Sequence, residues 1–226
     1  MGEIEELWQY HQTPGCQKPS DRKAVAIDCE MGTAKSGDSE LIRVTLLDYF
    51  SGQVLVDNLV DPDVPMRHFN TRYSGVRPVD MDIARRAGTC LHGRDSARNA
   101  VLQFVGPSTL VVGHSTQHDL TALRWIHPKV IDTYILESAL NETAENGAPI
   151  ESTLESLALS DVKIKNNAND SQQRSKGNGR LSLKMMSKVK LGRDIQTGQN
   201  GHDSFEDALA ARDLVHAYLT SQGAGV

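Results

Sequence analysis

Residues 24–32 read AVAIDCEMG, and this stretch decides how the rest of the chain is interpreted. Its first four residues are apolar, which is typical of a strand buried on both faces. Asp28 and Glu30 then follow, although burying a carboxylate without a partner costs several kcal/mol. Residues two apart on a strand share a face, so both carboxylates project together while Cys29 faces the core. The stretch predicts a divalent cation between the two acids, with a hydrated strand end as the alternative.

The segments beyond this strand predict an α/β fold. Residues 40–50 and 52–60 are rich in β-formers and separated by Ser51-Gly52, which indicates a hairpin. Further strands are expected at 109–115 and 129–133, and helices at 96–106, 116–126, 181–189 and 203–222. This order predicts a mixed five-stranded sheet, an antiparallel hairpin followed by parallel strands, flanked by helices. Residues 61–94 are expected to be mostly loop with short helical pieces.

Length and composition predict one packed domain. The chain has 226 residues, of which 38% are hydrophobic and 23% charged. We expect an N-terminal arm at 1–22 and a single domain at 23–221. A flexible basic insertion is expected at about 141–180, because Asn, Ser, Gln and Gly dominate there and only 153–160 has a helical pattern. Asp203 is expected to cap the last helix with Glu206 in a capping box, and Thr116 to cap the helix that follows it.

Several protein classes are disfavoured by the sequence. No run of about 18 apolar residues occurs, so we expect no membrane partner. The three cysteines contain no CxxC pair, which disfavours a disulfide framework or zinc site and favours a reducing compartment. The patterns GxSxG, HExxH and the P-loop are absent from the sequence.

Charge is unevenly distributed along the chain. The net charge is −5, which argues weakly against nucleic-acid binding. Residues 163–193 nevertheless carry nine Lys or Arg residues and one acid, an excess of eight positive charges. This basic segment is a candidate contact for a polyanion, and a solvated charged loop is the alternative.

Three more residues extend the chemistry of the opening stretch. Asp119 begins a helix directly after a buried strand, and Asp207 lies in the first turn of the last helix. Each acid could simply compensate a helix dipole. His202 precedes Asp207 by five residues and lies on a loop, where it is either a surface histidine or a group that takes a proton from water near neutral pH.

These residues resemble a known family. Asp28-x-Glu30, Asp119 and His202-x4-Asp207 resemble, in order, the three motifs of the DEDDh class of 3′→5′ exonucleases. The surrounding sequence is similar to the eukaryotic RNA exonuclease branch that includes Rex4-like proteins and the interferon-stimulated 20 kDa exonuclease. That similarity rests on IDCEMG, TRYSGV, VGHSTQHDL, HPKVIDT, SLKMM and LGRDIQTGQNGHDSFEDALAARDL, and spans roughly residues 22–220. The chain departs from the branch in its longer insertion and in His118, where Asn is common.

The resemblance implies an RNase H-like three-layer fold and a metal-dependent 3′→5′ exoribonuclease that releases nucleoside 5′-monophosphates from single-stranded RNA. Two Mg²⁺ or Mn²⁺ ions would be held by Asp28, Glu30, Asp119 and Asp207, with His202 as general base. Asp132 would support the site from a neighbouring strand. Substrate contacts are expected from Met31, Gly32, Cys29, His114, Ser115 and Arg43, although Met31 has ordinary core packing as its alternative.

Other functions stay open at this level. A related enzyme acting mainly on DNA ends would need the same acids, because the metal ions act on phosphate and not on the 2′-hydroxyl. A catalytically inactive nucleic-acid-binding module is a further alternative. Protein partners are not indicated. The expected location is intracellular, in the nucleus or cytoplasm, and the resemblance favours the nucleus or nucleolus.

Overall fold

A mixed sheet forms the centre of the molecule. The computed structural model describes residues 10–146, 181–198 and 201–223. Within these residues the sheet has the order β6-β4-β3-β2-β7-β9, with β5 pairing with β2, and a separate pair joins β1 to β8. The strands are β1 (His11–Gln12), β2 (Ala24–Ala34), β3 (Ser39–Asp48), β4 (Val54–Asp61), β5 (Met66–His68), β6 (Leu91–His92), β7 (Leu110–Gly113), β8 (Trp125–Ile126) and β9 (Val130–Asp132).

The register confirms the predicted mixture of strand directions. β2, β3 and β4 pair antiparallel, whereas β7 and β9 run parallel to β2. The five predicted strands are therefore β2, β3, β4, β7 and β9, and β5 and β6 are short additions. Between Glu30 and Met31 the register of β2 against β3 shifts by one residue, because Glu30 faces Arg43 while Met31 faces Leu41. Such bulges change which way the following side chains point.

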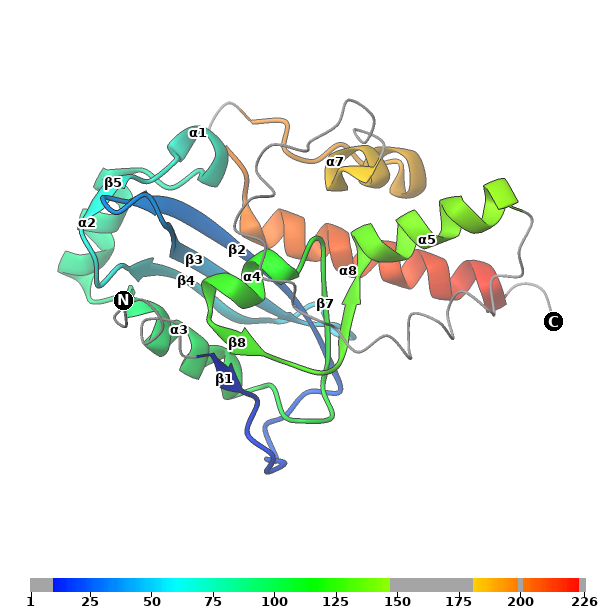
Figure 1. Cartoon of the computed structure of the whole chain (residues 1–226), viewed down its shortest axis with the longest axis horizontal. Coiled ribbons are helices and arrows are strands. Elements are labelled where there is room, and N and C mark those ends of the chain that lie inside the picture. Colours follow the sequence, from blue (N-terminus) through cyan, green and yellow to red (C-terminus); the bar gives the residue numbers. More distant parts are fainter. Residues whose placement is uncertain (1–9, 147–180, 199–200, 224–226) are drawn as a thin grey trace, which may run out of the picture.

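Helices cover both faces of the sheet. They are α1 (Thr71–Ser74), α2 (Pro78–Ala87), α3 (Gly93–Leu102), α4 (Gln117–Ala122), α5 (Thr133–Asn146), α7 (Leu183–Met186), the π-helix η3 (Ser187–Leu191) and α8 (Ser204–Gly223). Figure 1 shows α3 on one side of the central strands and α8 on the other, with α5 beside α8. Among the helices of the described residues, none is both long and apolar enough to span a bilayer.

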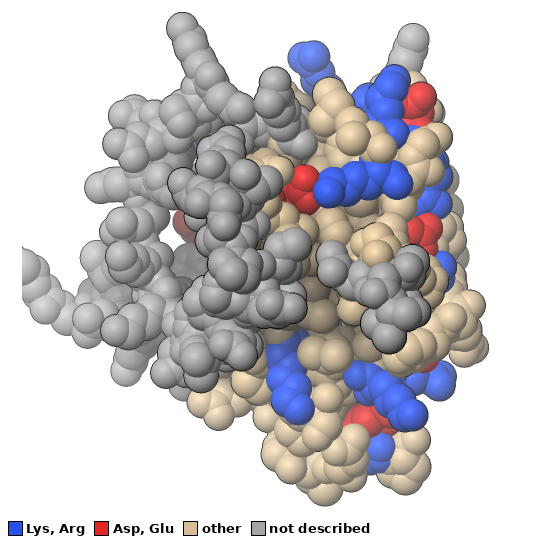
Figure 2. Space-filling view, turned by 90° about the vertical axis from the view of Figure 1, so that its right-hand side faces the viewer, with Lys and Arg blue, Asp and Glu red and all other residues tan. Residues whose placement is uncertain are grey.

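More than half of the predicted basic segment, residues 163–180, lies outside the described residues. The four described Lys and Arg residues at 184–193 all contact partners within the fold. On the side of the molecule that carries α5 and the end of α8, Lys and Arg side chains lie in separate groups with acidic side chains among them (Figure 2). The contacts are Lys184 with the Gln196 carbonyl, Lys188 with Asp194, Lys190 with Glu137, and Arg193 with Asp213.

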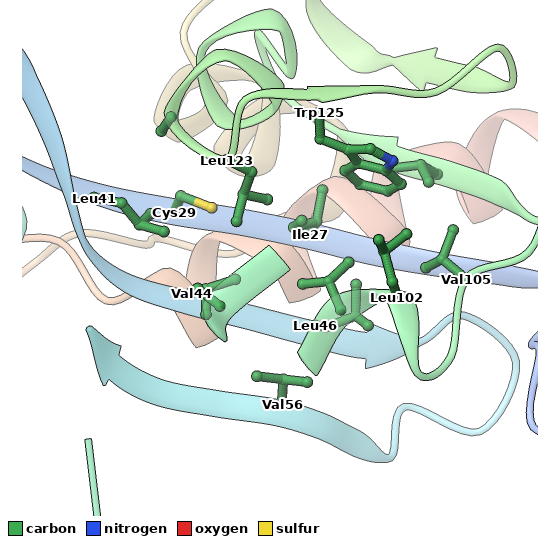
Figure 3. Packing of buried hydrophobic residues seen from close by; sticks show 14 of the residues in the cluster. Ile27, Cys29, Leu41, Val44, Leu46, Val56, Leu102, Val105, Leu123 and Trp125 are labelled. Carbon is green, nitrogen blue, oxygen red and sulfur yellow. The ribbon is translucent and has the colours of Figure 1, made fainter. Parts of the chain in front are cut away.

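Alternate residues of β2 pack into two different cores. Val25, Ile27 and Cys29 join the core between the sheet and α3, which also holds Trp125 (Figure 3). Ala24 and Ala26 face the opposite way and pack with Ala208 and Val215 of α8. Truncating a fully buried residue such as Ile27 to Ala should cost about 2–5 kcal/mol. The α8 face of β2 is the one on which Asp28 and Glu30 continue.

The structure differs from expectation in residues 61–94. The ten-residue helix α2 occupies part of this predicted loop, beginning with Pro78 at its first turn. The Asp80 side chain accepts a 3.0 Å hydrogen bond from the Arg77 N–H at the start of the helix, and Gly88 ends the helix in the left-handed conformation. Proline and glycine here mark the two ends of a helix, whereas composition alone suggested a loop.

Two other segments also depart from the predicted elements. The helix expected at 116–126 ends at Ala122, because Trp125 and Ile126 pair with β1 from the predicted N-terminal arm. The Thr116 side chain makes no capping hydrogen bond. At the predicted insertion, α5 continues to Asn146, and the rest of the insertion, with its helical pattern at 153–160, lies outside the described residues.

Candidate active site

The first two acids are mounted on the α8 face of β2. Asp28 lies opposite Thr45 of β3, and Glu30 lies opposite Arg43. Glu30 is 8% exposed, so its carboxylate has left water almost completely. Because the alternation that buries Ala24 and Ala26 continues to Asp28 and Glu30, the strand fixes both acids on one rigid surface.

Asp119 reaches β2 from the first turn of α4. Its Oδ1 accepts a hydrogen bond of 2.8 Å from the Cys29 N–H, between the two strand acids in sequence. The turn from β7 into α4 comes close to β2, since a Cβ on Gly113 would lie 2.7 Å from Thr116 Oγ1 and 3.2 Å from the Ile27 carbonyl oxygen. The backbone of β2 therefore positions the third acid directly.

The start of α8 is fastened to β3 beside the strand acids. Ser204 and Thr45 hydroxyls lie 2.7 Å apart. Asp203 Oδ1 accepts a 3.1 Å hydrogen bond from the Phe205 N–H and also lies 3.0 Å from Arg43 Nη1. These contacts bring Asp207, one turn further along α8, to the α8 face of β2, where it interacts electrostatically with both Asp28 and Glu30.

At this helix the predicted cap by Asp203 is confirmed, because its carboxylate accepts the Phe205 N–H, but the reciprocal bond predicted for Glu206 is wrong. Glu206 Oε2 accepts a 2.8 Å hydrogen bond from the Gln196 N–H, and the side chain of Gln196 donates a 2.9 Å hydrogen bond to Asp207 Oδ2. Gln196 has a φ of 54°, a strained conformation for a residue other than glycine. Sequence reasoning missed Gln196 because it lies in a segment without periodicity. The one signal that could have found Gln196 is that it lies within LGRDIQTGQNGHDSFEDALAARDL, a stretch that is similar to the RNA exonuclease branch.

His202 stands at the edge of the acids. Its Nδ1 lies 3.5 Å from Asp207 Oδ2, and its side chain is 43% exposed. One ligand atom each from His202, Glu30 and Asp207 lie within 4.8 Å of one another. Burial lowers the pKa of His202, and the positive charge of Lys184 lowers that pKa further. The imidazole is therefore biased toward the neutral form that accepts a proton.

The backbone of the loop before α8 is pinned to α1. The His202 N–H donates a 2.6 Å hydrogen bond to the Tyr73 carbonyl. Gly201 has a φ of +88°, and a Cβ there would lie 2.3 Å from the Gly75 nitrogen and 2.6 Å from the Thr71 carbonyl oxygen. Only glycine fits both this conformation and this approach. In Figure 1 the segment leading into α8 runs past α1.

The protonation of the acids reflects their burial. Burial, reinforced by the neighbouring carboxylates, raises the pKa of Asp28 well above its usual range and that of Glu30 to about 9. Burial also raises the pKa of Asp119 to about 8 and that of Asp207 to about 6, although hydrogen bonds from Cys29 and Gln196 act in the opposite direction. The ionised cluster is unfavourable unless a cation offsets its charge.

The donor set fits divalent metal ions. Carboxylate oxygens are the ligands that hard divalent cations prefer, and an imidazole joins them at the edge. Asp207 is 4% exposed, and its Oδ1 has no hydrogen-bond partner among the described residues. A buried oxygen without a partner is costly unless another group completes its contacts. A cation at this position would do so.

Four of the predicted substrate contacts, Met31, Gly32, Cys29 and Arg43, lie on β2 and β3. Met31 and Gly32 lie next to the acids, and a Cβ on Gly32 would be 2.5 Å from Met66 Cε, so that segment packs closely there. The Cys29 side chain is buried in the α3 core, and only its backbone N–H is used at the site. The Arg43 guanidinium is held by Asp57 and Asp203.

His114 and Ser115 belong to the turn between β7 and α4. The Ser115 N–H donates a 2.9 Å hydrogen bond to Asp132 Oδ1, and His114 Nδ1 lies 2.9 Å from Thr133 Oγ1. Asp132 also contributes to the raised pKa of Asp119. These contacts link the turn to β9 and α5, and they give Asp132 a position that supports the Asp119 side of the site.

The sequence of this chain is similar to those of named proteins. No model of a protein family matches this sequence. The chain is 33% identical over 197 residues to RNA exonuclease 3 of Yarrowia lipolytica, covering 86% of this chain and 21% of that protein. It is 34% identical over 194 residues to interferon-stimulated 20 kDa exonuclease-like 2 of Bos taurus, covering 85% of this chain and 45% of that protein. The chain thus spans less than half the length of these relatives.

Solved structures share the fold. The Pan2 module of Saccharomyces cerevisiae, solved in complex with AAGGAA RNA, matches with a TM-score of 0.63 and 23% identity, covering 95% of this chain and 32% of that one. The Pan2 catalytic unit of Neurospora crassa matches with a TM-score of 0.63 and 20% identity, covering 97% of this chain and 31% of that one. These likenesses confirm the predicted RNase H-like fold.

Fold and relatives agree on the class that this chain resembles: it has the RNase H-like fold of DEDD-type exonuclease domains, and its sequence relatives are named as exonucleases. Within that class, its sequence relatives are the proteins named RNA exonuclease 3 and interferon-stimulated 20 kDa exonuclease-like 2. This confirms the resemblance drawn from the motifs. Exonucleases of this class depend on divalent metal ions.

Proposed function

We propose that this chain is a 3′→5′ exoribonuclease that hydrolyses single-stranded RNA from its 3′ end to nucleoside 5′-monophosphates. The observation that carries the proposal is the convergence of Glu30, Asp207 and His202, with a buried oxygen of Asp207 that has no hydrogen-bond partner in the described part of the chain. The names of the sequence relatives support RNA as the substrate. The Pan2 structures in complex with RNA support a single strand.

We propose two Mg²⁺ or Mn²⁺ ions as cofactors, held by Asp28, Glu30, Asp119 and Asp207. When bound, the ions would stabilise charge on the attacking and leaving oxygens of an in-line displacement. The carboxylates then act in their ionised form, which burial alone disfavours. β2 and the start of α8 hold them in place before substrate arrives, so little reorganisation is needed at the moment of reaction.

His202 acts as the general base in this proposal. Its lowered pKa leaves it neutral near pH 7, and its partial exposure allows it to reach a water molecule. Asp207, 3.5 Å from Nδ1, orients the ring and stabilises the imidazolium that forms when the proton is accepted. The hydrogen bond from the His202 N–H to Tyr73 sets the position of the base along the site.

We propose that residues 23–221 form one exonuclease domain and that the basic segment at 163–193 assists RNA binding. Contacts with carboxylates or a carbonyl occupy the four Lys and Arg residues described at 184–193, so the 163–178 portion is expected to contribute more. Deleting 163–178 should weaken RNA binding and flatten its salt dependence, as measured by anisotropy across a salt series. An unchanged affinity and slope would contradict this role.

We also propose that the protein acts inside the cell, in the nucleus or cytoplasm. All three cysteines, at positions 16, 29 and 90, are free, which suits a reducing compartment. Imaging of a fluorescent fusion would test this assignment.

The central experiment follows single nucleotides leaving a labelled strand. Single-stranded RNA and DNA of matching sequence, labelled at the 5′ end, are incubated with Mg²⁺, Mn²⁺ or EDTA. We expect a ladder that shortens from the 3′ end in either metal, faster for RNA, with 5′-monophosphates as product. A 3′-phosphate should block it. Shortening from the 5′ end, or activity in EDTA, would refute the proposal, and faster DNA hydrolysis would favour action on DNA ends.

A further inference from the structure

We propose that Asp61, Cys90 and His92 form a binding site for a thiophilic divalent ion such as Zn²⁺, separate from the acids of β2 and α8. One ligand atom from each of the three residues lies within 4.8 Å of the other two. Carboxylate, thiolate and imidazole are the side-chain groups that bind Zn²⁺ in proteins, and the sulfur favours such an ion over Mg²⁺ or Ca²⁺. The inference is independent of the proposed function.

The pairing of β4 with β6 brings these ligands together. The two strands run parallel, and Asp61 lies opposite His92 where both strands end. Cys90 lies two residues before His92 in the sequence. The ligands therefore come from two segments that meet only in the folded sheet. A search for CxxC pairs, which disfavoured a zinc site, would not find such an arrangement.

The Asp61 carboxylate is held in position by the fold. Its Oδ1 accepts hydrogen bonds of 2.8 and 2.6 Å from Arg85 Nε and Nη2. Its Oδ2 lies 3.9 Å from His92 Nδ1, which is too long for a hydrogen bond. One oxygen is thus used by the fold, whereas the other is directed toward the imidazole. A metal-binding carboxylate is usually oriented by a hydrogen bond of this kind.

The spacing of the ligands is close to that of a zinc site. Two ligand atoms of a tetrahedral Zn²⁺ ion lie roughly 3.3–3.7 Å apart, as its bond lengths require. The His92 ring therefore has to move by only about half an ångström, and its side chain is 75% exposed and free to turn. Cys90 is 8% exposed and packs with Met81 and Ala84 of α2, so the core fixes its position.

The charge of the site also suits a divalent ion. The Cys90 thiolate and the Asp61 carboxylate would supply two negative charges to Zn²⁺. Arg85 pairs with Asp82 as well as with Asp61, so its positive charge is shared between two acids. Three protein ligands leave the fourth tetrahedral position to a water molecule, which can reach the site beside the exposed imidazole.

The site is distinct from the acids of the candidate active site. Glu30 and Leu59 lie opposite Arg43 on its two sides, so β4 is two strand spacings, about 10 Å, from β2. Asp61 lies two residues beyond Leu59. The two sites therefore cannot share an ion. β6 pairs with β4 over two residues only, so an ion held by Asp61, Cys90 and His92 would fasten this short strand to the sheet.

The test uses Co²⁺ as a spectroscopic probe for this site. A thiolate ligand gives Co²⁺ a charge-transfer band in the near ultraviolet that oxygen and nitrogen ligands do not give. The full chain is reduced, supplied with excess Mg²⁺ for the acids of β2 and α8, and titrated with Co²⁺. We expect the band to appear and saturate. Zn²⁺ in slight excess should remove it, because Zn²⁺ binds such ligands more tightly than Co²⁺.

Two variants and two matched controls assign the band to residues. Cys90→Ser should abolish it. His92→Ala should weaken Co²⁺ binding by at least about tenfold, since the loss of even an outer partner of a metal ligand costs that much. Cys16→Ser and His68→Ala, at an exposed cysteine and an exposed histidine outside the site, should bind Co²⁺ as the wild-type protein does. Circular dichroism checks that each variant is folded.

Three results would overturn the site: no band in the wild-type protein, a band that persists in Cys90→Ser, or an unchanged affinity in His92→Ala. If Cys90→Ser fails to fold, His92→Ala decides the question, because its side chain is mostly exposed. The absorbance does not depend on RNA hydrolysis. A protein that shows the band but hydrolyses no RNA would therefore count against the proposed function and not against this site.

Discussion

Two sets of buried acids lie on or against the central strands, and they differ in the cation that accompanies them. Glu40, at the start of β3, is 7% exposed and forms a salt bridge with the buried guanidinium of Arg94. Glu30, Asp119 and Asp207 are buried to the same degree, at 8%, 4% and 4% exposure. Burial raises the pKa of each of these three. Of these four acids, Glu40 alone receives a dedicated cation from the described residues.

The difference indicates that Glu30, Asp119 and Asp207, unlike Glu40, are placed to bind a cation that is not part of the protein. Arg43 is the cation that lowers the pKa values of Asp28 and Glu30, yet it is shared with Asp57 and Asp203. A buried charge without full compensation is expensive, so such a cluster persists only where it serves a ligand or a reaction. Four predictions test this comparison, from the largest expected effect to the smallest.

Removing an acid from the uncompensated cluster should abolish turnover. Asp28→Asn is expected to lower kcat/KM on RNA by about 10³-fold or more, because metal ions supply several kcal/mol of charge stabilisation. The fold should persist, as measured by circular dichroism, since the substitution removes charge and little volume. Asp38→Asn, at an exposed acid in the β2–β3 turn, serves as control and should keep full activity. Near-normal turnover by Asp28→Asn would contradict the assigned role.

Removing the cation from the compensated pair should instead damage stability. Arg94→Met leaves Glu40 buried and unpaired, which is expected to cost about 3–5 kcal/mol in the free energy of unfolding. The double variant Glu40→Met with Arg94→Met should recover much of that loss, because two apolar side chains can replace a buried ion pair. Urea denaturation measures both. A double variant less stable than Arg94→Met would show that the pair is not acting as a unit.

The support of Asp207 should appear in metal affinity. Gln196→Ala removes the hydrogen bond to Asp207 Oδ2 and is expected to weaken Mn²⁺ binding by about 10-fold, the lower end of the usual cost of losing such a support. Isothermal titration with Mn²⁺ alone measures this without turnover. Gln103→Ala, at an exposed glutamine that follows α3, is the matched control. Equal affinities for the two variants would remove Gln196 from the site.

The metal-free protein should lose stability as pH rises. The folded pKa values of Asp207, Asp119 and Glu30, about 6, 8 and 9, lie above those of the unfolded chain. The folded state therefore binds more protons, and stability falls as pH rises from about 4 toward 9. In EDTA, the melting temperature should drop by at least about 3 °C between pH 6 and pH 9, as ~1 kcal/mol would give.

Two comparisons sharpen this pH experiment. Mn²⁺ should stabilise the protein more at pH 9 than at pH 6, because ionised carboxylates bind the ion. Glu30→Gln should raise the stability of the metal-free protein at pH 8 and flatten the slope, since glutamine needs no proton to enter the site. A melting temperature in EDTA that rises between pH 6 and pH 9 would contradict the raised pKa values.

The sequence was sufficient for the features that depend on local patterns. The period of two along β2 places Asp28 and Glu30 on one face, and the Ser51-Gly52 turn fixes the β3–β4 hairpin. The positions of Asp119 and Asp207 at helix starts follow from helical periodicity and, for Asp207, from the Asp203 cap. The spacing of these acids along the sequence resembles that of a known family, and this resemblance indicated that they form one site.

The contacts that hold the site together could not be predicted in this way. Glu206 bonds to Gln196 and not to the Asp203 N–H, because the loop before α8 returns to compete for its carboxylate. Arg43 is committed to two acids that lie 14 and 160 residues away in sequence. Such pairings depend on how distant segments pack, and neither spacing nor composition records them.

The backbone contact between Gly201 and Gly75 has a consequence for mutagenesis. No side chain stands between the loop that carries His202 and the turn that ends α1, so a survey restricted to functional side chains would pass over both positions. A bulkier residue at either position would displace the imidazole while leaving the four acids and His202 themselves intact. Sequence variants at these glycines should therefore lower activity as the loss of His202 does, and annotation based on the catalytic residues alone would still score them as competent enzymes.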